Sequence, residues 1–315
     1  MQPAIGIDWG TSSLRATLLD ADGSVREERA RPWGIRHLPQ GGFERALSDI
    51  CAGWPDCPVI ASGMVGSRQG WHEVPYVDAP AGLEVLAEYA TRFDAGGGRT
   101  LSIVPGVRDA VRLDVMRGEE TEIMGALAMC PDLAITSQIV LPGTHSKWVN
   151  IREGRIAGFS TMMTGEIYAL LTQHSILGAM IPAGMPSATD WPAFDNGVRT
   201  AHASGNAGVL TQIFSARTLA LESRLERAAI PSYISGLLIG EEWRAMLASG
   251  WLASSAPTLV GDARQCTLYQ RAATTFGLPQ PAALSGTAAH GAWQVHLALA
   301  TQRTGAADPS TQEPA

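Results

Sequence analysis

Short alternations of apolar and polar residues open the chain and predict three consecutive strands. The alternating segments cover residues 4–8, 13–19 and 24–29. Gly10 interrupts the alternation after the first segment, and an Asp22-Gly23 pair, a strong hairpin signal, separates the second from the third. The N-terminal residues are therefore expected to form strands joined by tight turns.

The same pattern returns in the middle of the chain. Strand-like segments at residues 138–141, 146–151 and 155–162 are separated by a turn at 142–145 and by the Glu153-Gly154 pair. The two opening turns, Gly10-Thr11-Ser12-Ser13 and Gly143-Thr144-His145-Ser146, lie 133 residues apart. Such an approximate duplication predicts two similar lobes that present their glycine-hydroxyl turns to one cleft.

The segments around the two copies predict an α/β protein. Before the second copy we expect strands at residues 59–61 and 100–104, a glycine-rich turn at 62–71, and helices at 83–93 and after Arg117-Gly118. After it we expect helices at residues 166–178, 209–228 and 233–248, a strand at 258–260 with a helix to Phe276, and a strand at 282–284 with a helix to Ala300. The predicted lobes cover residues 1–135 and 136–302, and a disordered tail covers 303–315.

Composition and charge narrow the class of protein. The chain has 315 residues, 45% hydrophobic and 17% charged, so it can bury a large core and exceeds the usual size of a single one. Its net charge of -7 argues against nucleic-acid binding and against an anionic membrane surface. Without an apolar run of bilayer length or a basic segment before apolar residues at the N-terminus, a cytoplasmic enzyme is expected.

The cysteines carry no recognisable metal or redox motif. Four are present, and they form neither a C-x-x-C pair nor a zinc spacing: Cys51, Cys57, Cys130 and Cys266. In a reducing compartment they are expected to be buried thiols. The sequence leaves the oligomeric state open, a homodimer included.

The first glycine-hydroxyl turn combines groups that suit a magnesium-bound phosphate. Asp8 supplies a carboxylate at the end of a strand, and Gly10, Thr11, Ser12 and Ser13 supply a close backbone approach with N–H and hydroxyl donors. Backbone amides in tight turns form anion-binding concavities. The alternative is that Asp8 and Thr11 only satisfy a hairpin turn.

The second turn contains the only lysine of the chain. Lys147 stands against 22 arginines, so an ammonium group is expected to be required at this position. A compact point charge fits against a phosphate or carboxylate where the planar guanidinium does not. The alternative is an accident of composition. His145 in the same turn can accept a proton near working pH, with Asp8 and Glu166 as competing candidates for the base, although a histidine bonded into a turn is also common.

Residues outside the two turns are candidates for substrate binding. Arg117 precedes a helix start and can hold a carboxylate with two parallel hydrogen bonds, whereas Glu120 and Glu166, in first helical turns, are favoured there by the helix dipole even without a function. Ser67 and Trp71 in the glycine-rich turn can contact a polyol; packing is an equal alternative for Trp71.

Several enzyme classes are excluded because their motifs are absent. The chain has neither the G-x-x-x-x-G-K-[ST] of P-loop kinases nor the G-x-G-x-x-G of dinucleotide-binding folds. It also lacks the G-x-S-x-G nucleophile elbow and the H-E-x-x-H zinc motif.

Six blocks together resemble the 2-dehydro-3-deoxygalactonokinase family, in order over roughly residues 4–300. They are IGIDWGTSSLRA (5–16), SGMVGSRQGW (62–71), VMRGEETEIMGA (115–126), LPGTHSKWV (141–149), TMMTGEIYALL (161–171) and ISGLLIGEEW (234–243). The resemblance implies an actin-like ATPase superfold with two ribonuclease-H-like lobes around a nucleotide cleft. It also implies transfer of the ATP γ-phosphoryl group to the 6-hydroxyl of 2-dehydro-3-deoxy-D-galactonate in galactonate or galactose catabolism.

The resemblance also assigns roles to residues. Asp8 with Gly10 to Ser13 looks like the first phosphate motif, with Mg²⁺ held through Asp8, and Gly143-Thr144 looks like the second. Residues 258–262 stand where the adenosine motif is expected, but Asp262 follows Gly261 in place of a second glycine, and Gly240 is placed with the nucleotide-binding residues. The second phosphate motif lacks the aspartate that many related sugar kinases use as base, and His145 stands nearest that place.

The remaining expected contacts are with the phosphates and the sugar acid. Lys147 would offset charge on the transferred group, and Arg117, with Arg15 as a further candidate, would orient the substrate carboxylate. Ser67, Trp71, Glu120 and Glu166 complete the expected substrate contacts. Two alternatives stay open: a kinase of the same fold for another aldonate or ketose, and a nucleotide-dependent sugar-acid sensor or ATP hydrolase that transfers no phosphate to a sugar.

Overall fold

The computed structural model describes residues 2–96, 98–184, 188–251 and 256–305, and these residues divide into two compact units. The first unit contains residues 1–137, 149–159 and 286–315, and the second contains residues 138–148 and 160–285. The chain therefore passes between the units more than once, and strands β10, β11 and β12 contribute residues to both. The predicted tail lies outside the described residues from residue 306 onward.

The main sheet of the first unit has the strand order β3-β2-β1-β4-β7-β6. Its strands are β1 (Ala4–Trp9), β2 (Leu14–Leu19), β3 (Val25–Arg31), β4 (Val59–Gly63), β6 (Thr91–Asp94) and β7 (Thr100–Ile103). Strands β1, β2 and β3 form an antiparallel meander, β4 and β7 continue the sheet in parallel with β1, and β6 runs antiparallel to β7. In this register Asp8 lies opposite Arg15 on β2 and Ser62 on β4.

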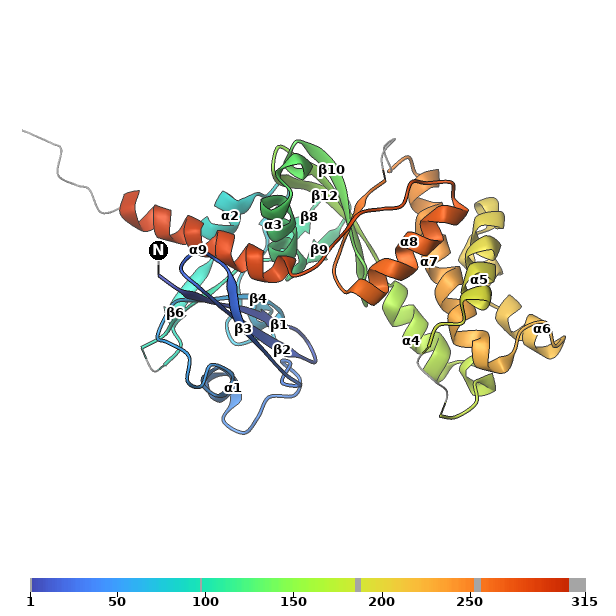
Figure 1. Ribbon diagram of the computed structural model, residues 1–315, viewed down its shortest axis with the longest axis horizontal. Helices are drawn as coiled ribbons and strands as arrows, with labels where there is room; N and C mark the ends of the chain where they lie inside the picture. Colours follow the sequence, from blue (N-terminus) through green and yellow to red (C-terminus); the bar gives the residue numbers. More distant parts are fainter. Residues whose placement is uncertain (1, 97, 185–187, 252–255, 306–315) are drawn as a thin grey trace, which may run out of the picture. The chain divides into compact units, whose positions relative to one another are not determined.

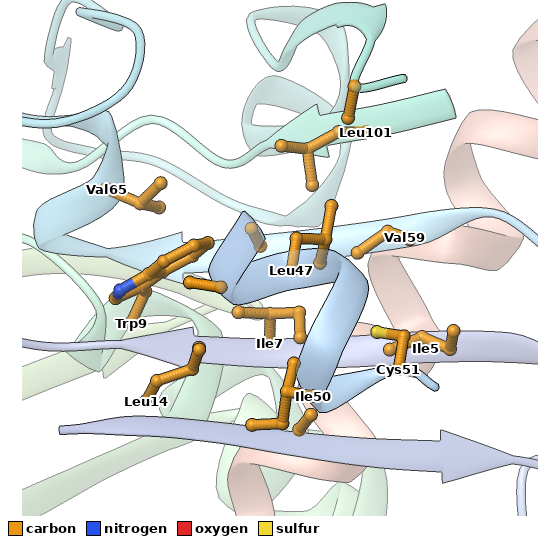
Figure 2. Packing of buried hydrophobic residues seen from close by; sticks show 14 of the residues in the cluster. Ile5, Ile7, Trp9, Leu14, Leu47, Ile50, Cys51, Val59, Val65 and Leu101 are labelled. Carbon is orange, nitrogen blue, oxygen red and sulfur yellow. The ribbon is translucent and has the colours of Figure 1, made fainter. Parts of the chain in front are cut away.

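Helix α1 (Gly42–Ile50) covers one face of this sheet because its apolar residues repeat at helical spacing. Leu47 and Ile50 face Ile5 and Ile7 of β1, as Figure 2 shows, and all four side chains are buried. Trp9 completes the β1 contribution to this cluster and is fully buried. The alternation that predicts β1 thus reflects a strand whose apolar side chains anchor the core.

Helices α3 (Glu119–Met129) and α9 (Thr287–Gly305) pack against each other in the first unit (Figure 1). Glycine permits their close approach: a Cβ at Gly125 would lie 1.9 Å from the Thr287 carbonyl oxygen, and one at Gly291 would lie 1.8 Å from that of Thr121. The unit also contains α2 (Leu83–Glu88) and a small sheet, β5 (Val77–Asp78), β8 (Val107–Asp109) and β9 (Asp114–Met116), in the order β5-β8-β9.

The second large sheet repeats the strand order of the first. It runs β12-β11-β10-β13-β14 and contains β10 (Thr136–Leu141), β11 (Ser146–Arg152), β12 (Arg155–Met162), β13 (Thr258–Val260) and β14 (Ala283–Leu284). Strand β13 is parallel to β10, and β14 is parallel to β13. This order matches β3-β2-β1-β4-β7, so the duplicated sequence pattern corresponds to a duplicated sheet topology.

The second unit is mostly helical (Figure 1). Its helices are α4 (Thr164–His174), α5 (Trp191–Ala203), α6 (Ser215–Leu221), α7 (Ile230–Ala248) and α8 (Ala263–Thr275). The chain also forms short 3₁₀ turns at Met64–Gly66, Pro131–Ala134, Gly178–Met180, Gly205–Ala207, Val209–Thr211 and Arg227–Ala229. Helices α5 and α7 cross through glycines, since a Cβ at Gly236 would lie 2.0 Å from the Phe194 carbonyl oxygen.

Most predicted elements are confirmed, and the wrong ones have local causes. The strands of both copies and the strands at 59–61, 100–104, 258–260 and 282–284 are present, with ends shifted by at most two residues. The helix predicted over 83–93 is wrong beyond Glu88: half-buried Thr91 and Phe93 alternate with exposed Arg92 and Asp94, and β6 pairs with β7 instead. The helix predicted over 209–228 is wrong as a single helix and is reduced to α6 between 3₁₀ turns.

Other elements went unpredicted. Helices α1 and α5 and the strands β5, β8 and β9 had no counterpart in the sequence-based prediction. Cys51, Cys57 and Cys266 are buried thiols as expected, whereas Cys130 is half-buried. No helix in the described part of the chain combines the length and hydrophobicity needed to cross a bilayer.

Candidate active site

The first turn sits at the end of β1, held by short backbone hydrogen bonds. Gly10 N–H donates to the Ser13 carbonyl (2.9 Å), and Ile35 N–H donates to the Gly10 carbonyl (3.1 Å). Thr11 and Ser12 are exposed at the tip. The turn therefore presents its hydroxyls to solvent while its backbone is fixed from behind.

Asp8 stands among other ionisable groups. Its carboxylate lies 3.7 Å from Arg15 Nη1 across the β1–β2 pair. Burial raises the pKa of Asp8, Arg15 opposes this shift, and the charge of Glu119 adds to it. Glu122 on α3 has its pKa raised to about 8 by burial and then by Asp8 and Glu119. Burial is thus the main cause of both shifts, and the neighbouring carboxylates add to it.

Two glycines bring the start of α3 and the end of β4 close to Asp8. A Cβ at Gly63 would lie 2.8 Å from the Trp9 carbonyl oxygen and 3.5 Å from Asp8 Oδ1. Gly118 has φ +113°, a conformation that side chains disfavour, and a Cβ there would lie 3.3 Å from the Cα of Gly63. Any larger residue at either place would push α3 away from the aspartate.

Arg117 and Ser67 offer unsatisfied donors beside this cluster. The guanidinium Nη2 of Arg117 donates to the Val74 carbonyl (2.7 Å), and the group stacks over the Tyr76 ring at 4.2 Å. Its Nε and Nη1, and the Oγ of Ser67, are buried and lack a partner among the described residues. A Cβ at Gly66 would lie 2.9 Å from Arg117 Nη1, which places the guanidinium against the glycine-rich turn.

Trp71 and Glu120 lie in packed surroundings. The Trp71 ring stacks on Phe43 with centroids 5.6 Å apart and meets Trp9 edge-on at 6.1 Å. Glu120 is fully buried, accepts a hydrogen bond from Gly118 N–H (2.7 Å), and has its pKa raised to about 8 by burial and by Glu119. Their predicted substrate contacts stay predictions.

The lone lysine lies on β11, directly after the second turn, and is buried. Only 3% of Lys147 is exposed, and its Nζ donates to the His145 carbonyl (3.0 Å). Glu166 Oε2 accepts a hydrogen bond from His145 Nε2 (2.5 Å), and both of these side chains are half exposed. Glu166 N–H donates to the Thr144 carbonyl (3.0 Å). The beginning of α4 is therefore bonded directly to the turn.

A cavity of about 640 Å³ opens beside this turn within the second unit. Its walls come from the second turn, α4, α7 and α8, and include Gly143, Thr144, Thr164, Gly165, Tyr168, Ser232, Ser235, Leu238, Ile239, Arg264, Gln265, Leu268 and Tyr269. Its size and its mixed polar and apolar lining are typical of a small-molecule site.

The altered adenosine motif begins one wall of the cavity. Gly261 has φ +140°, and Asp262 caps α8 by accepting from the Arg264 N–H (3.0 Å) and the Gln265 N–H (3.2 Å). Gly240 does not line the cavity; a Cβ there would lie 2.8 Å from the Cβ of Ala201, so this glycine lies at the α5–α7 crossing. Its predicted nucleotide role is untested.

Sequence reasoning missed one buried carboxyl group near the cavity. Glu242 on α7 is 1% exposed and accepts hydrogen bonds from Trp148 Nε1 (2.7 Å) and the Tyr269 hydroxyl (2.6 Å). The Tyr269 hydroxyl also shares a hydrogen bond with Ser146 Oγ (2.8 Å). Apolar Leu238 and Ile239 before it and Trp243 after it are a weak sequence signal that this glutamate is buried and needs partners.

The duplicated sheets define the class of protein, and comparison with solved structures supports it. Component A of (R)-2-hydroxyglutaryl-CoA dehydratase from Acidaminococcus fermentans matches with a TM-score of 0.51 at 12% identity, covering 95% of this chain and 99% of that one. At that identity the likeness concerns the fold alone. The chain has the actin-like ATPase fold.

Comparisons at higher identity identify the family. The model of the 2-keto-3-deoxy-galactonokinase family matches residues 8–295. A 2-dehydro-3-deoxygalactonokinase of Escherichia coli (strain K12) is 35% identical over 290 residues, covering 90% of this chain and 94% of that protein. An assigned 2-dehydro-3-deoxygalactonokinase of Rhizobium meliloti (strain 1021) is 37% identical over 279 residues, covering 86% and 89%.

A solved structure agrees over almost the whole chain. The crystal structure of an assigned 2-dehydro-3-deoxygalactonokinase from Sinorhizobium meliloti has a TM-score of 0.83 at 35% identity, covering 96% of this chain and 99% of that one. The chain belongs to the 2-keto-3-deoxy-galactonokinase family.

Proposed function

We propose that this protein is an ATP-dependent kinase that phosphorylates the 6-hydroxyl of 2-dehydro-3-deoxy-D-galactonate in galactonate catabolism. Family membership supports the reaction. The observation that carries the proposal is the 640 Å³ cavity whose wall includes the second glycine-threonine turn, Gly143-Thr144. The cavity has room for the nucleoside part of ATP, and the backbone and hydroxyl donors beside it suit the phosphates of ATP.

The nucleotide is assigned to residues 136–302. Tyr168, Leu238, Ile239 and Leu268 give the cavity apolar surface for a base, and Arg264 and Gln265 add polar groups. Gly143 and Thr144 are exposed and line the same cavity, so they suit the phosphate end of the nucleotide. Lys147, buried directly after the second turn, contributes positive charge close to these donors.

The sugar acid is assigned to residues 1–135. The partnerless Nε and Nη1 of Arg117 and the partnerless Oγ of Ser67 are buried donors that the described residues leave unsatisfied. Such groups are unfavourable unless a ligand completes them, and a guanidinium binds a carboxylate with two parallel hydrogen bonds. Arg117 is therefore proposed to bind the substrate carboxylate, and Ser67 a hydroxyl of the chain.

A magnesium ion fits the surroundings of Asp8. The carboxyl groups of Asp8 and Glu122 interact with each other and with Glu119, so a cation beside Asp8 would face several carboxylates. No cluster of three ligand side chains is preassembled among the described residues, and Mg²⁺ characteristically uses one or two carboxylates together with water and phosphate oxygens. When bound through Asp8, the ion would supply charge neutralisation for the phosphates.

The chain's own residues then bind, orient and move a proton. Thr11 and Ser12 at the first turn, and Thr144 at the second, donate hydrogen bonds to phosphate oxygens. The base that accepts the proton of the 6-hydroxyl is one of Asp8, His145 and Glu166. We place Asp8 first among them, because it stands at the end of β1 beside the first turn, in the unit to which the sugar acid is assigned.

A coupled ADP-release assay tests the proposal. The panel contains 2-dehydro-3-deoxy-D-galactonate, its gluconate epimer, a plain aldonate and a hexose, each with MgATP. We expect ADP release with the galactonate derivative to exceed the rate with water alone by at least about a hundredfold. A faster rate with another aldonate would reassign the substrate, and ADP release independent of any sugar acid would make the protein a hydrolase.

A further inference from the structure

The carboxyl group of Glu242 occupies an energetically unfavourable position. It lies in the interior of α7 and is 1% exposed, and burial raises its pKa. The hydrogen bonds that oppose this shift come from neutral donors on Thr164, Tyr269, Trp148 and Ser146. Burying a carboxyl group with neutral partners is often less favourable than an apolar residue of similar volume. Stability of the fold alone therefore gives little reason for a glutamate here.

Two partners of Glu242 come from separate walls of the 640 Å³ cavity, and the other two lie on β11. Thr164 lines the cavity where α4 begins, and Tyr269 lines it from α8. Trp148 lies on β11 directly after the second turn, and its Nε1 donates to Glu242 Oε2 at 2.7 Å. Helix α7, which carries Glu242, supplies a further wall through Leu238 and Ile239. One carboxyl group thus joins three helices that line the cavity, α4, α7 and α8, to strand β11, which follows the second turn.

The same network reaches the second turn itself. Tyr269 hydroxyl donates to Glu242 Oε1 (2.6 Å) and shares a hydrogen bond with Ser146 Oγ (2.8 Å). Ser146 Oγ lies 3.4 Å from the Gly143 N–H that points to it and 3.5 Å from the Gly143 carbonyl oxygen. A displacement of the carboxyl group would therefore be passed through Tyr269 to the glycine that faces the nucleotide.

We infer that Glu242 is the positioning residue of the nucleotide site: it holds the Gly143–Ser146 turn, the start of α4 and the middle of α8 in the arrangement that binds ATP, without contacting the nucleotide. The inference rests on the proposed function. Four donors converging on one buried acceptor fix their elements more tightly than separate surface bonds do. Preorganised sites of this kind bind ligand without first ordering their walls.

Glu242→Gln tests the inference because the amide keeps the shape of the side chain but changes one acceptor into a donor. We expect the KM for ATP to rise about tenfold and the KM for the sugar acid to stay within about twofold of the wild-type value. Loss of a residue that orients ligand-binding groups has effects of this size in other sites. Direct binding of a non-hydrolysable ATP analogue, measured by calorimetry without sugar acid, should weaken by the same factor.

A matched pair of tyrosines separates positioning from general packing. Tyr269 and Tyr233 are both buried, and each hydroxyl is bonded to a serine, Ser146 at 2.8 Å and Ser215 at 2.7 Å. Tyr233 does not line the cavity. Tyr269→Phe and Tyr233→Phe should lower the melting temperature alike, whereas only Tyr269→Phe should raise the KM for ATP.

The outcomes are distinct. If Glu242→Gln folds and binds the analogue as tightly as the wild type, the inference is wrong and the proposed function stands. If Tyr233→Phe weakens nucleotide binding as much as Tyr269→Phe does, the network acts through stability alone and the inference is also wrong. If the wild-type protein binds no nucleotide, the inference and the proposed function fail together. Should Glu242→Gln not fold, Ser146→Ala replaces it, with the same expected rise in the KM for ATP.

Discussion

The two glycine-hydroxyl turns occupy the same place in two sheets of the same strand order, yet their surroundings differ in kind. Around the first turn lie charged groups: Asp8, Arg15 and the acidic start of α3. Around the second turn lies a buried network of neutral donors centred on Glu242, with one enclosed ammonium group. The two copies thus share a strand order. The proposed function divides the roles between them: charge neutralisation at the first turn and nucleotide binding at the second.

Matching positions make this division concrete. Leu14 of the first copy is fully buried, and its counterpart 133 residues later is Lys147, which is 3% exposed. Exposed Ser12 corresponds to His145. Burying an ammonium group where the other copy buries leucine is unfavourable for folding, so its retention points to a role in binding or catalysis.

The largest expected effect concerns the charged turn. Asp8→Asn should lower kcat by about a thousandfold or more, because it removes the group proposed to hold magnesium and to serve as base. Binding of the ATP analogue should fall far less, since the cavity belongs to the other unit. Steady-state kinetics and calorimetry measure the two quantities. An active variant would remove Asp8 from both roles.

The sequence predicts this turn well because its signals are local. The Asp22-Gly23 hairpin, the alternation of β1 and the glycine at each turn need no tertiary information. Glu242 could not be predicted in this way, because its partners Trp148 and Tyr269 lie 94 and 27 residues away in the sequence. No residue within 234–243 indicates which side chains these partners are. β6 was missed because pairing with β7 overrides the helical tendency of the preceding residues.

The acidic start of α3, near the first turn, should make the stability of the protein depend on pH. Burial raises the pKa of Glu120 from 4.5 to about 8, so the folded state holds a proton that the unfolded state releases. Stability from this group is present below pH 4.5 and is lost as the pH rises towards 8. Each pH unit in this window is worth roughly 1.4 kcal/mol at most. Glu120→Gln should remove this part of the decline.

Urea denaturation at about pH 5.5 and pH 8.5 measures the effect. The gap between the two unfolding free energies should narrow by a few kcal/mol in Glu120→Gln. Glu88→Gln, at an exposed site at the end of α2, is the control and should leave the gap unchanged. An unchanged gap in Glu120→Gln would mean that the buried carboxyl group does not titrate in this range.

A smaller effect is expected from the buried lysine. Lys147→Met keeps the length of the side chain but removes its charge, and we expect kcat to fall about tenfold to a hundredfold if the ammonium group offsets charge on the phosphates. Leu14→Met at the matching position of the first copy should change kcat less than about twofold, because the exchange conserves volume. Equal effects of the two variants on kcat would reduce Lys147 to a packing residue.

Lys147→Arg asks a narrower question about the same site. A 3% exposed pocket fitted to an ammonium group has little space for a guanidinium, so the variant should also lose activity. If its rate and both Michaelis constants equal those of the wild type, the single lysine is an accident of composition.

The smallest expected effect distinguishes the candidate bases. His145 is half exposed and its Nε2 is bonded to Glu166 at 2.5 Å, whereas Asp8 has its pKa raised by burial. If Asp8 is the base, His145→Gln should lower kcat by only about threefold, because the variant loses just the hydrogen bond between the turn and α4. Removal of the general base itself would lower kcat by about a hundredfold or more. The pH–rate profile checks the assignment: a loss of about a hundredfold in kcat, together with disappearance of the acid limb of the profile, would make His145 the base. The second turn would then take part in proton transfer, and the division between the two turns would fail.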